Sequence, residues 1–142
     1  MKIAVIDGQG GGIGKALVDA VRSAHSNGFF GQEAIELYAL GTNALATSLM
    51  LRSGANYGAT GENAILINAP KMDIIMGPIG IISANALLGE LTPKMAEAIS
   101  SAEAAKILIP IHKCNITVAG VVPKALGGYI EDAIDYVKSK MA

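Results

Sequence analysis

The chain has 142 residues, a length that fits one domain around one hydrophobic core. Hydrophobic residues make up 51% of it and charged residues 16%, which argues against a disordered chain. A count of 11 basic and 12 acidic residues leaves a formal charge of −1, and tryptophan is absent. Neither a basic face nor an aromatic stacking platform for nucleic acid is therefore expected.

Three features bear on the compartment and on metals. The single cysteine, Cys114, cannot form an internal disulfide or a cysteine-rich metal site, so no metal is predicted. The apolar run at the N-terminus is too short for a signal peptide. The longest uncharged stretch, residues 74–89, is too short and too interrupted by glycine and proline to cross a bilayer. We therefore expect a cytoplasmic protein with neither a membrane partner nor a nucleic-acid partner.

Short apolar strands alternate with amphipathic helices in the first half of the chain. In chain order, the pattern predicts a strand at 3–6, a helix at 13–24 that stops near Gly28, a strand at 35–40 and a helix at 44–53. Residues 54–61, rich in glycine and other small side chains, predict a loop. Residues 62–69 fit a strand through Ile65 and Ile67, or a helix through a cap at Thr60 and the strand that follows. We favour the helix.

The second half continues the alternation. It predicts a strand at 73–76, a short helix at 83–88, a helix that begins at Thr92 and Pro93, strands at 106–109 and 116–119, and a last helix with an apolar face from Leu126 to Val137. Only residues 110–115 separate the last two strands. Because a parallel crossover needs a dozen or more residues, we expect these two strands to be antiparallel.

This order of elements predicts one Rossmann-like α/β domain over residues 1–142. We expect a three-layer sandwich with a mostly parallel sheet of about five strands and one antiparallel edge strand. In such sheets, ligands bind beyond the carboxyl ends of the strands. Four unusual segments directly follow predicted strands, namely residues 7–14, 41–43, 77–80 and 112–115. We therefore expect all four to meet at one edge of the sheet.

The first of these segments carries the sharpest signal, because five of the seven residues from 8 to 14 are glycine. Backbone N–H groups in such a loop can approach an anion closely, and the following helix adds a favourable dipole. A turn without a ligand would need only one or two glycines. We predict a site for a small phosphate-bearing ligand formed by Gly8, Gln9, Gly10, Gly11, Gly12, Ile13, Gly14, Thr42, Asn43, Gly77, Pro78 and Gly80.

Two common phosphate-binding patterns fail in this loop. The dinucleotide pattern G-x-G-x-x-G fails because Ile13 stands at its third glycine. The Walker A pattern fails because Gln9 stands at its first glycine and Ala16 at its Ser/Thr position. Without that hydroxyl the expected Mg²⁺ ligand is missing, so an NTPase is not predicted.

A third pattern fits. Gly8, Gly12, Ile13 and Gly14 match Gly-x-x-x-Gly-Ile-Gly, and the loop thereby resembles that of the short-chain dehydrogenases. The resemblance implies an NAD(P)-type dinucleotide as the ligand.

The rest of the chain departs from that family. Thr42 and Asn43 follow the second strand, where the family often places an acidic residue for the adenosine ribose. Tyr136 and Lys140 have the family's Tyr-x-x-x-Lys spacing, but they lie off the apolar face of the last helix. We interpret both as surface residues, so the resemblance does not extend to dehydrogenase activity.

A broader resemblance covers the whole chain. Residues 6–14, 39–44, 58–64 and 77–81 together resemble a small bacterial Rossmann-like family of unknown function. This resemblance supports the fold and implies no activity.

Three residues are weaker candidates for catalysis. His112 and Cys114 alternate on a segment after a predicted strand, so they could share one pocket as an activated thiolate. A loop histidine and a buried thiol are the simpler alternative. Glu62 could act as an acid or base or bind a ribose hydroxyl, although a charge in a first helical turn explains it equally.

These observations predict a nucleotide-binding protein whose leading ligand is an NAD(P)-type dinucleotide, with the reaction left open. The alternative is a non-catalytic sensor of a phosphorylated metabolite. The predicted helix over residues 44–51 is apolar nearly all round, whereas a helix on the outside of a sheet should have a polar face. We therefore expect a homodimer.

Overall fold

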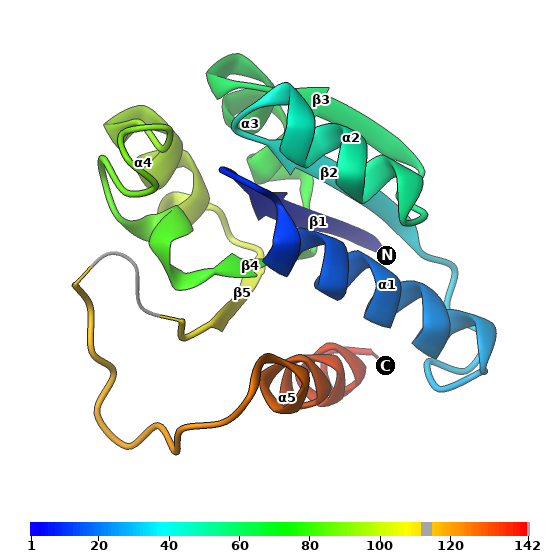
Figure 1. Ribbon diagram of the computed structural model, residues 1–142. Helices are drawn as coiled ribbons and strands as arrows, with labels where there is room; N and C mark the ends of the chain where they lie inside the picture. The colour runs from blue at the N-terminus through cyan, green and yellow to red at the C-terminus, as the bar shows by residue number, and fades with distance from the viewer. Residues whose placement is uncertain (112–114, 142) are drawn as a thin grey trace.

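The computed structural model describes residues 1–111 and 115–141 and shows three layers, a sheet between two sets of helices (Figure 1). In chain order the elements are β1 (Lys2–Asp7), α1 (Gly12–Ser26), β2 (Glu36–Gly41), α2 (Ala44–Arg52), β3 (Tyr57–Thr60), α3 (Glu62–Asn68), the 3₁₀ helix η1 (Ala69–Lys71), β4 (Ile74–Pro78), the 3₁₀ helix η2 (Ile79–Ile82), α4 (Pro93–Ser101), β5 (Ala105–Ile109) and α5 (Leu126–Ser139).

The five strands form one sheet in the order β3-β2-β1-β4-β5, and every neighbouring pair is parallel. The central strand is β1, where Ile3 lies opposite Leu37 of β2 and Ile74 of β4. The chain first builds outward on one side of β1 through β2 and β3, and then crosses to the other side for β4 and β5. The order of strands therefore reverses between β1 and β4, and α/β sheets bind ligands at such a switch point.

Side chains that alternate along β1 enter two separate cores. Ile3 and Val5 pack into the core that contains residues of α1 and α5, and Ala4 and Ile6 into the core that contains residues of α3 and α4. All four side chains are fully buried. Because helices cover both faces of the sheet, the central strands β1 and β4 are buried along almost their whole length rather than at alternate positions. Among the described residues, no helix has the length and hydrophobicity that a membrane span requires.

The choice of a helix for residues 62–69 is confirmed by α3. The expected cap at Thr60 is wrong, because Thr60 ends β3 and its hydroxyl donates to Thr47 Oγ1 at 2.8 Å. The N-cap of α3 is Gly61, which has no side chain to cap with. By contrast, Thr92 does cap α4, since its Oγ1 accepts from Met95 N at 3.2 Å.

The predicted antiparallel edge strand is wrong. Residues 116–119 form no strand. The sheet still has five strands, because β3 lies inside the segment expected to be a loop. A Cβ added to Gly58 would lie 2.6 Å from Leu51 Cδ1, so the close packing of α2 requires a very small residue there. This gives β3 the composition of a loop. The β-branched residues of 116–119 favour a strand, but a strand also needs a neighbour with which to pair.

The predicted short helix at 83–88 is also wrong. The 3₁₀ helix η2 ends at Ile82, and residues 83–91 form a series of turns that we call the turn segment. Within it, Asn85, Leu87 and Leu88 have φ angles of 66°, 58° and 56°. These left-handed conformations are incompatible with a right-handed helix, although the apolar composition suggested one.

Candidate functional site

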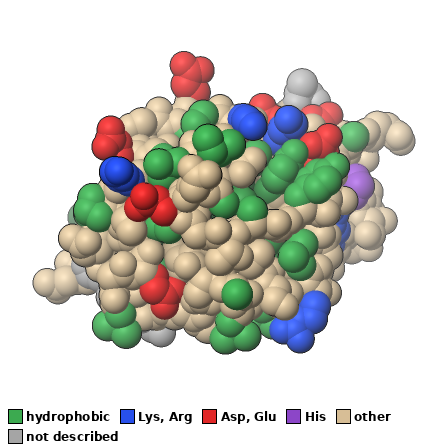
Figure 2. Space-filling view, turned by 90° about the horizontal axis from the view of Figure 1, so that it is seen from above, with side chains coloured by type: hydrophobic (Ala, Val, Ile, Leu, Met, Phe, Trp, Pro, Cys, Tyr) green, Lys and Arg blue, Asp and Glu red, His purple; other side chains and the backbone are tan. Residues whose placement is uncertain are grey.

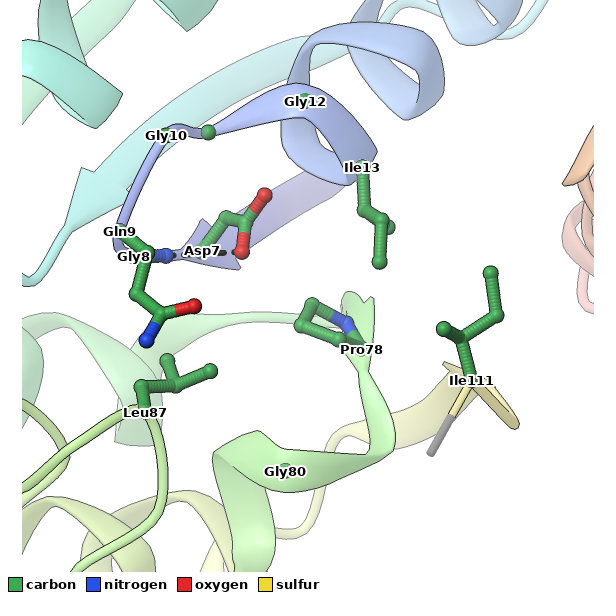
Figure 3. Close-up of a pocket in the computed structure, with 11 residues that line it drawn as sticks. Asp7, Gly8, Gln9, Gly10, Gly12, Ile13, Pro78, Gly80, Leu87 and Ile111 are labelled. Carbon is green, nitrogen blue, oxygen red and sulfur yellow. Dashed lines mark hydrogen bonds between the residues drawn. The ribbon is translucent and has the colours of Figure 1, made fainter. Parts of the chain in front are cut away.

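A cavity of about 190 Å³ lies at the switch point, beyond the carboxyl ends of β1 and β4 (Figure 3). Its wall is formed by residues from four segments, namely Asp7, Gly8, Gln9, Gly10, Gly11, Gly12, Ile13, Pro78, Gly80, Leu87 and Ile111. The parallel sheet thus brings together the segments that follow β1, β4 and β5. Of the four segments that we expect from the sequence to meet, two contribute to the wall of this cavity, namely residues 7–14 and 77–80.

The glycine loop between β1 and α1 is anchored by Asp7, the last residue of β1. Asp7 is only 4% exposed. Its Oδ1 accepts from Gly8 N at 2.8 Å and its Oδ2 accepts from Gly14 N at 2.6 Å. One carboxylate therefore fixes both ends of the loop through charge-assisted hydrogen bonds.

Gly11 and Gly14 are required by the packing of α1. Gly11 has a φ of 74°, and a Cβ there would lie 2.9 Å from Ala46 Cα of α2. At Gly14, a Cβ would lie 2.6 Å from Met50 Sδ and 2.8 Å from Asp7 Cβ. These glycines allow α1 to pack closely against α2 and β1.

Gly10 and Gly12 are different. A Cβ added at either position would meet no heavy atom within 4 Å, and neither residue has a left-handed φ. Neither close packing nor backbone conformation within the described chain therefore explains why these positions lack a side chain. Both residues line the cavity, so their open sides leave room for a ligand.

The backbone N–H groups of the loop also form two groups, those with a hydrogen-bond acceptor and those without one among the described residues. Four have acceptors, since Gly8 and Gly14 donate to Asp7, Gln9 to Glu90, and Gly11 to Gly8. Toward the described residues, the N–H groups of Gly10, Gly12 and Ile13 donate no hydrogen bond. The residues that carry these three N–H groups belong to the cavity wall at the N-terminus of α1, a place that suits an anion.

A second carboxylate, Glu90, joins the loop to the end of β2. Its Oε1 accepts from Gln9 N at 2.9 Å, from Thr42 Oγ1 at 2.6 Å and from Asn43 Nδ2 at 2.9 Å. The hydrogen bond from Thr42, followed by that from Gln9, lowers the pKa of the Glu90 carboxyl, against the opposing effect of burial. Glu90 is therefore an anion at neutral pH.

The predicted residues Thr42 and Asn43 reach the loop mainly through this network. Asn43 also donates from Nδ2 to Gln9 O at 3.0 Å, and its Oδ1 caps α2 by accepting from Ala46 N at 2.9 Å. Sequence reasoning missed Glu90, because no spacing rule connects it with residues so distant in the chain. Its one signal is isolation, since no other charged residue lies between Asp73 and Lys94.

The remaining candidates have other surroundings. Gly77 lies within β4 against the Ile6 carbonyl, where a side chain would collide with β1. Glu62 is not part of the cavity wall. It lies in the first turn of α3, and its Oε2 accepts from Thr92 Oγ1 at 2.6 Å. Glu62 thus links α3 to the start of α4, while His112 and Cys114 lie outside the described residues.

Comparison with known proteins gives a family but no activity. No curated protein matches the sequence. Within residues 1–111 and 115–141, no group of three His, Cys, Asp or Glu side chains could hold a metal ion. The sequence profile of a family described as "Domain of unknown function (DUF3842)" matches residues 2–142. The chain therefore belongs to this family of unknown function, and the match extends over almost its whole length.

Proposed function

We propose that the protein binds an NAD(P)-type dinucleotide, with the pyrophosphate at the glycine loop. The observation that carries the proposal is that Gly10, Gly12 and Ile13 belong to the cavity wall and that their N–H groups donate to none of the described residues. An anion placed there would gain three backbone hydrogen bonds and the favourable end of the α1 dipole. The open sides of Gly10 and Gly12 give it space.

The rest of the cavity suits the flat nicotinamide ring of the dinucleotide. Ile13, Pro78, Leu87 and Ile111 contribute apolar wall on the side of β4 and β5. Binding sites for cofactors commonly combine such apolar walls with a few backbone donors. The carboxylate of Asp7 accepts hydrogen bonds from the two ends of the loop and thereby fixes the loop's shape.

A second candidate function is a sensor that binds a phosphorylated metabolite without converting it. One observation favours it. Among the described residues that form the cavity wall, Asp7 alone has a titratable side chain, and that side chain holds the loop. Consumption of NADH during incubation with a candidate substrate would establish that the protein is an enzyme. A sensor would bind the cofactor and leave its absorbance unchanged.

We expect NADH or NADPH to bind measurably in a calorimetric titration, and ATP not to be hydrolysed. The reason for the second expectation is Ala16, which stands where a P-loop enzyme has the hydroxyl that binds Mg²⁺. The absence of binding for both dinucleotides at millimolar concentration would contradict the first expectation. Mg²⁺-dependent ATP turnover that Gly12→Val removes would contradict the second.

We also propose a homodimer formed through α2 and the edge strand β3. Leu45 and Leu51 of α2 are 60% and 39% exposed, and Tyr57 of β3 is 53% exposed. Figure 2 views the molecule from above, the side on which these elements lie in Figure 1, and shows hydrophobic side chains at the surface among charged ones. Exposed apolar side chains beside an unpaired strand edge favour association with a second copy.

Light scattering at micromolar concentration should therefore give twice the mass of the chain, and Leu45→Glu should give the monomer mass. Exchange of the exposed Leu88, which lies in the turn segment, for Glu serves as the matched control and should leave the dimer intact. A monomer for the parent protein would reject this proposal.

A further inference from the structure

The end of β2 gains from the fold an acidic group that it lacks in sequence. Dinucleotide-binding α/β proteins hold the adenosine ribose at this strand end, through an acidic side chain that accepts from the ribose hydroxyls. Here Thr42 and Asn43 follow β2, and neither is acidic. The turn segment instead places the carboxylate of Glu90 against both of them and against Gln9 N.

The carboxylate of Glu90 is fixed but not saturated. All three donors bind the same oxygen, Oε1, at distances between 2.6 and 2.9 Å. Within the described part of the chain, Oε2 accepts no hydrogen bond. One oxygen therefore orients the group, and the other keeps its full capacity to accept hydrogen bonds from a ligand.

The first glycine of the loop makes this arrangement possible. A Cβ added to Gly8 would collide with the Thr42 hydroxyl and would lie 2.9 Å from Glu90 Oε1. The loop, the end of β2 and the turn segment thus meet at a point that only glycine fits. Gly8 therefore has its own role, which is to bring the Glu90 carboxylate next to the loop that would hold the pyrophosphate.

Among the described residues, the charge of Glu90 has no cationic partner. In the ranges 1–111 and 115–141 the ion pairs are Lys15 with Asp19 and Lys124 with Asp132, and neither pair involves Glu90. A ribose that carries a 2′-phosphate would therefore meet an anion that no Lys or Arg of the described part of the chain balances. Proteins that accept the 2′-phosphate generally supply such a basic group.

We infer that Glu90 holds the hydroxyl groups of an unphosphorylated ribose and makes the site selective for NAD over NADP. The inference rests on the proposed function, because it assigns the adenosine side of the same dinucleotide. In this arrangement the nicotinamide ring lies in the cavity near Pro78 and Ile111. The adenosine ribose lies at Thr42, Asn43 and Glu90. The turn segment takes part in both, since Leu87 forms cavity wall while Glu90 binds the end of β2.

Calorimetric titrations of the protein with NADH and with NADPH test this inference. The parent protein should bind NADH about tenfold more tightly than NADPH, which corresponds to one charged hydrogen bond. Glu90→Gln keeps an oxygen for the three donors and replaces the other by an amide that donates. It should weaken NADH binding about tenfold and spare NADPH binding, so that the preference disappears.

Glu97→Gln is the matched control, because Glu97 is an exposed residue of α4 and the charge change is the same. It should bind both dinucleotides as the parent does. A parent protein that binds NADPH as tightly as NADH overturns the inference even where Glu90→Gln fails to fold. An equal loss of both ligands in a folded Glu90→Gln overturns it too, by showing a structural role. If neither dinucleotide binds the parent, the proposed function itself is wrong, and this inference with it.

Discussion

Gly12→Val is expected to abolish dinucleotide binding and to leave the protein folded. Gly12 begins α1 with an ordinary backbone conformation, and no heavy atom lies within 4 Å of an added Cβ. A valine there should therefore cost little or no stability, because even a β-branched residue has a better helix propensity than glycine. The added methyl groups would fill the space beside the N–H groups of Gly12 and Ile13, which the pyrophosphate needs.

Thermal unfolding and a calorimetric titration with NADH on the same preparation check this result. The melting temperature should stay within a few degrees of the parent value, while binding falls at least about a hundredfold, as expected when several backbone hydrogen bonds to an anion are lost. A Gly127→Val variant gives a matched control, because Gly127 is also in the first turn of a helix and has open space around it. A folded Gly12→Val that binds as the parent does would show that the loop is only a turn.

Gly14→Ala, in contrast to Gly12→Val, is expected to lower the stability of the fold strongly. The new methyl group would lie 2.6 Å from Met50 Sδ and 2.8 Å from Asp7 Cβ, distances at which atoms must move apart. Displacement of Asp7 would also disturb the hydrogen bonds that its carboxylate accepts from Gly8 and Gly14. We expect a net loss of about 1–3 kcal/mol in the free energy of unfolding, typical of overpacking in a core.

Urea denaturation of Gly14→Ala and Gly12→Ala measures the difference directly. The two variants add the same methyl group to the same helical turn, and alanine favours a helix over glycine by about 1 kcal/mol in both. Gly12→Ala should therefore be as stable as the parent or more so. Equal stability of the two variants would contradict the division of the loop into structural glycines and ligand-side glycines.

Much of the architecture follows from patterns within short windows of sequence. Apolar runs such as residues 3–6 indicated buried parallel strands, and Thr92 with Pro93 marked the start of a helix. The density of glycine after the first strand indicated the segment that lines the cavity. These features depend on local chemistry and on the covering of both sheet faces, so the sequence is sufficient to predict them.

The errors concern features that depend on distant neighbours. Gly58 made β3 read as a loop, because the sequence does not reveal that Leu51 packs directly against it. Residues 116–119 have strand propensity without a strand. Apolar residues at 83–88 suggested a helix, but there Leu87 contributes to the cavity wall and Glu90 reaches Thr42. For β3 and for the turn segment, propensity is overridden by contacts that only the folded chain creates.

The division of the loop glycines also required the structure. From the sequence alone, Gly8, Gly10, Gly11, Gly12 and Gly14 all appear as ligand candidates. The packing around Gly11 and Gly14 gives them a structural role, and Gly8 makes room for Thr42 and Glu90. The case for a ligand therefore rests on Gly10 and Gly12, because neither packing nor backbone conformation among the described residues requires glycine at these two positions.

The N–H groups of Gly10, Gly12 and Ile13 are proposed to bind the phosphates of a dinucleotide. Titration of ¹⁵N-labelled protein with NADH, followed by the NMR shifts of the backbone amides, measures this binding at each residue. Saturable shifts should be largest at these three amides, with smaller shifts at Thr42 and Asn43 and none on the distant end of α5. Loop amides that do not move at millimolar NADH or NADPH, in spectra that show a folded protein, would contradict it.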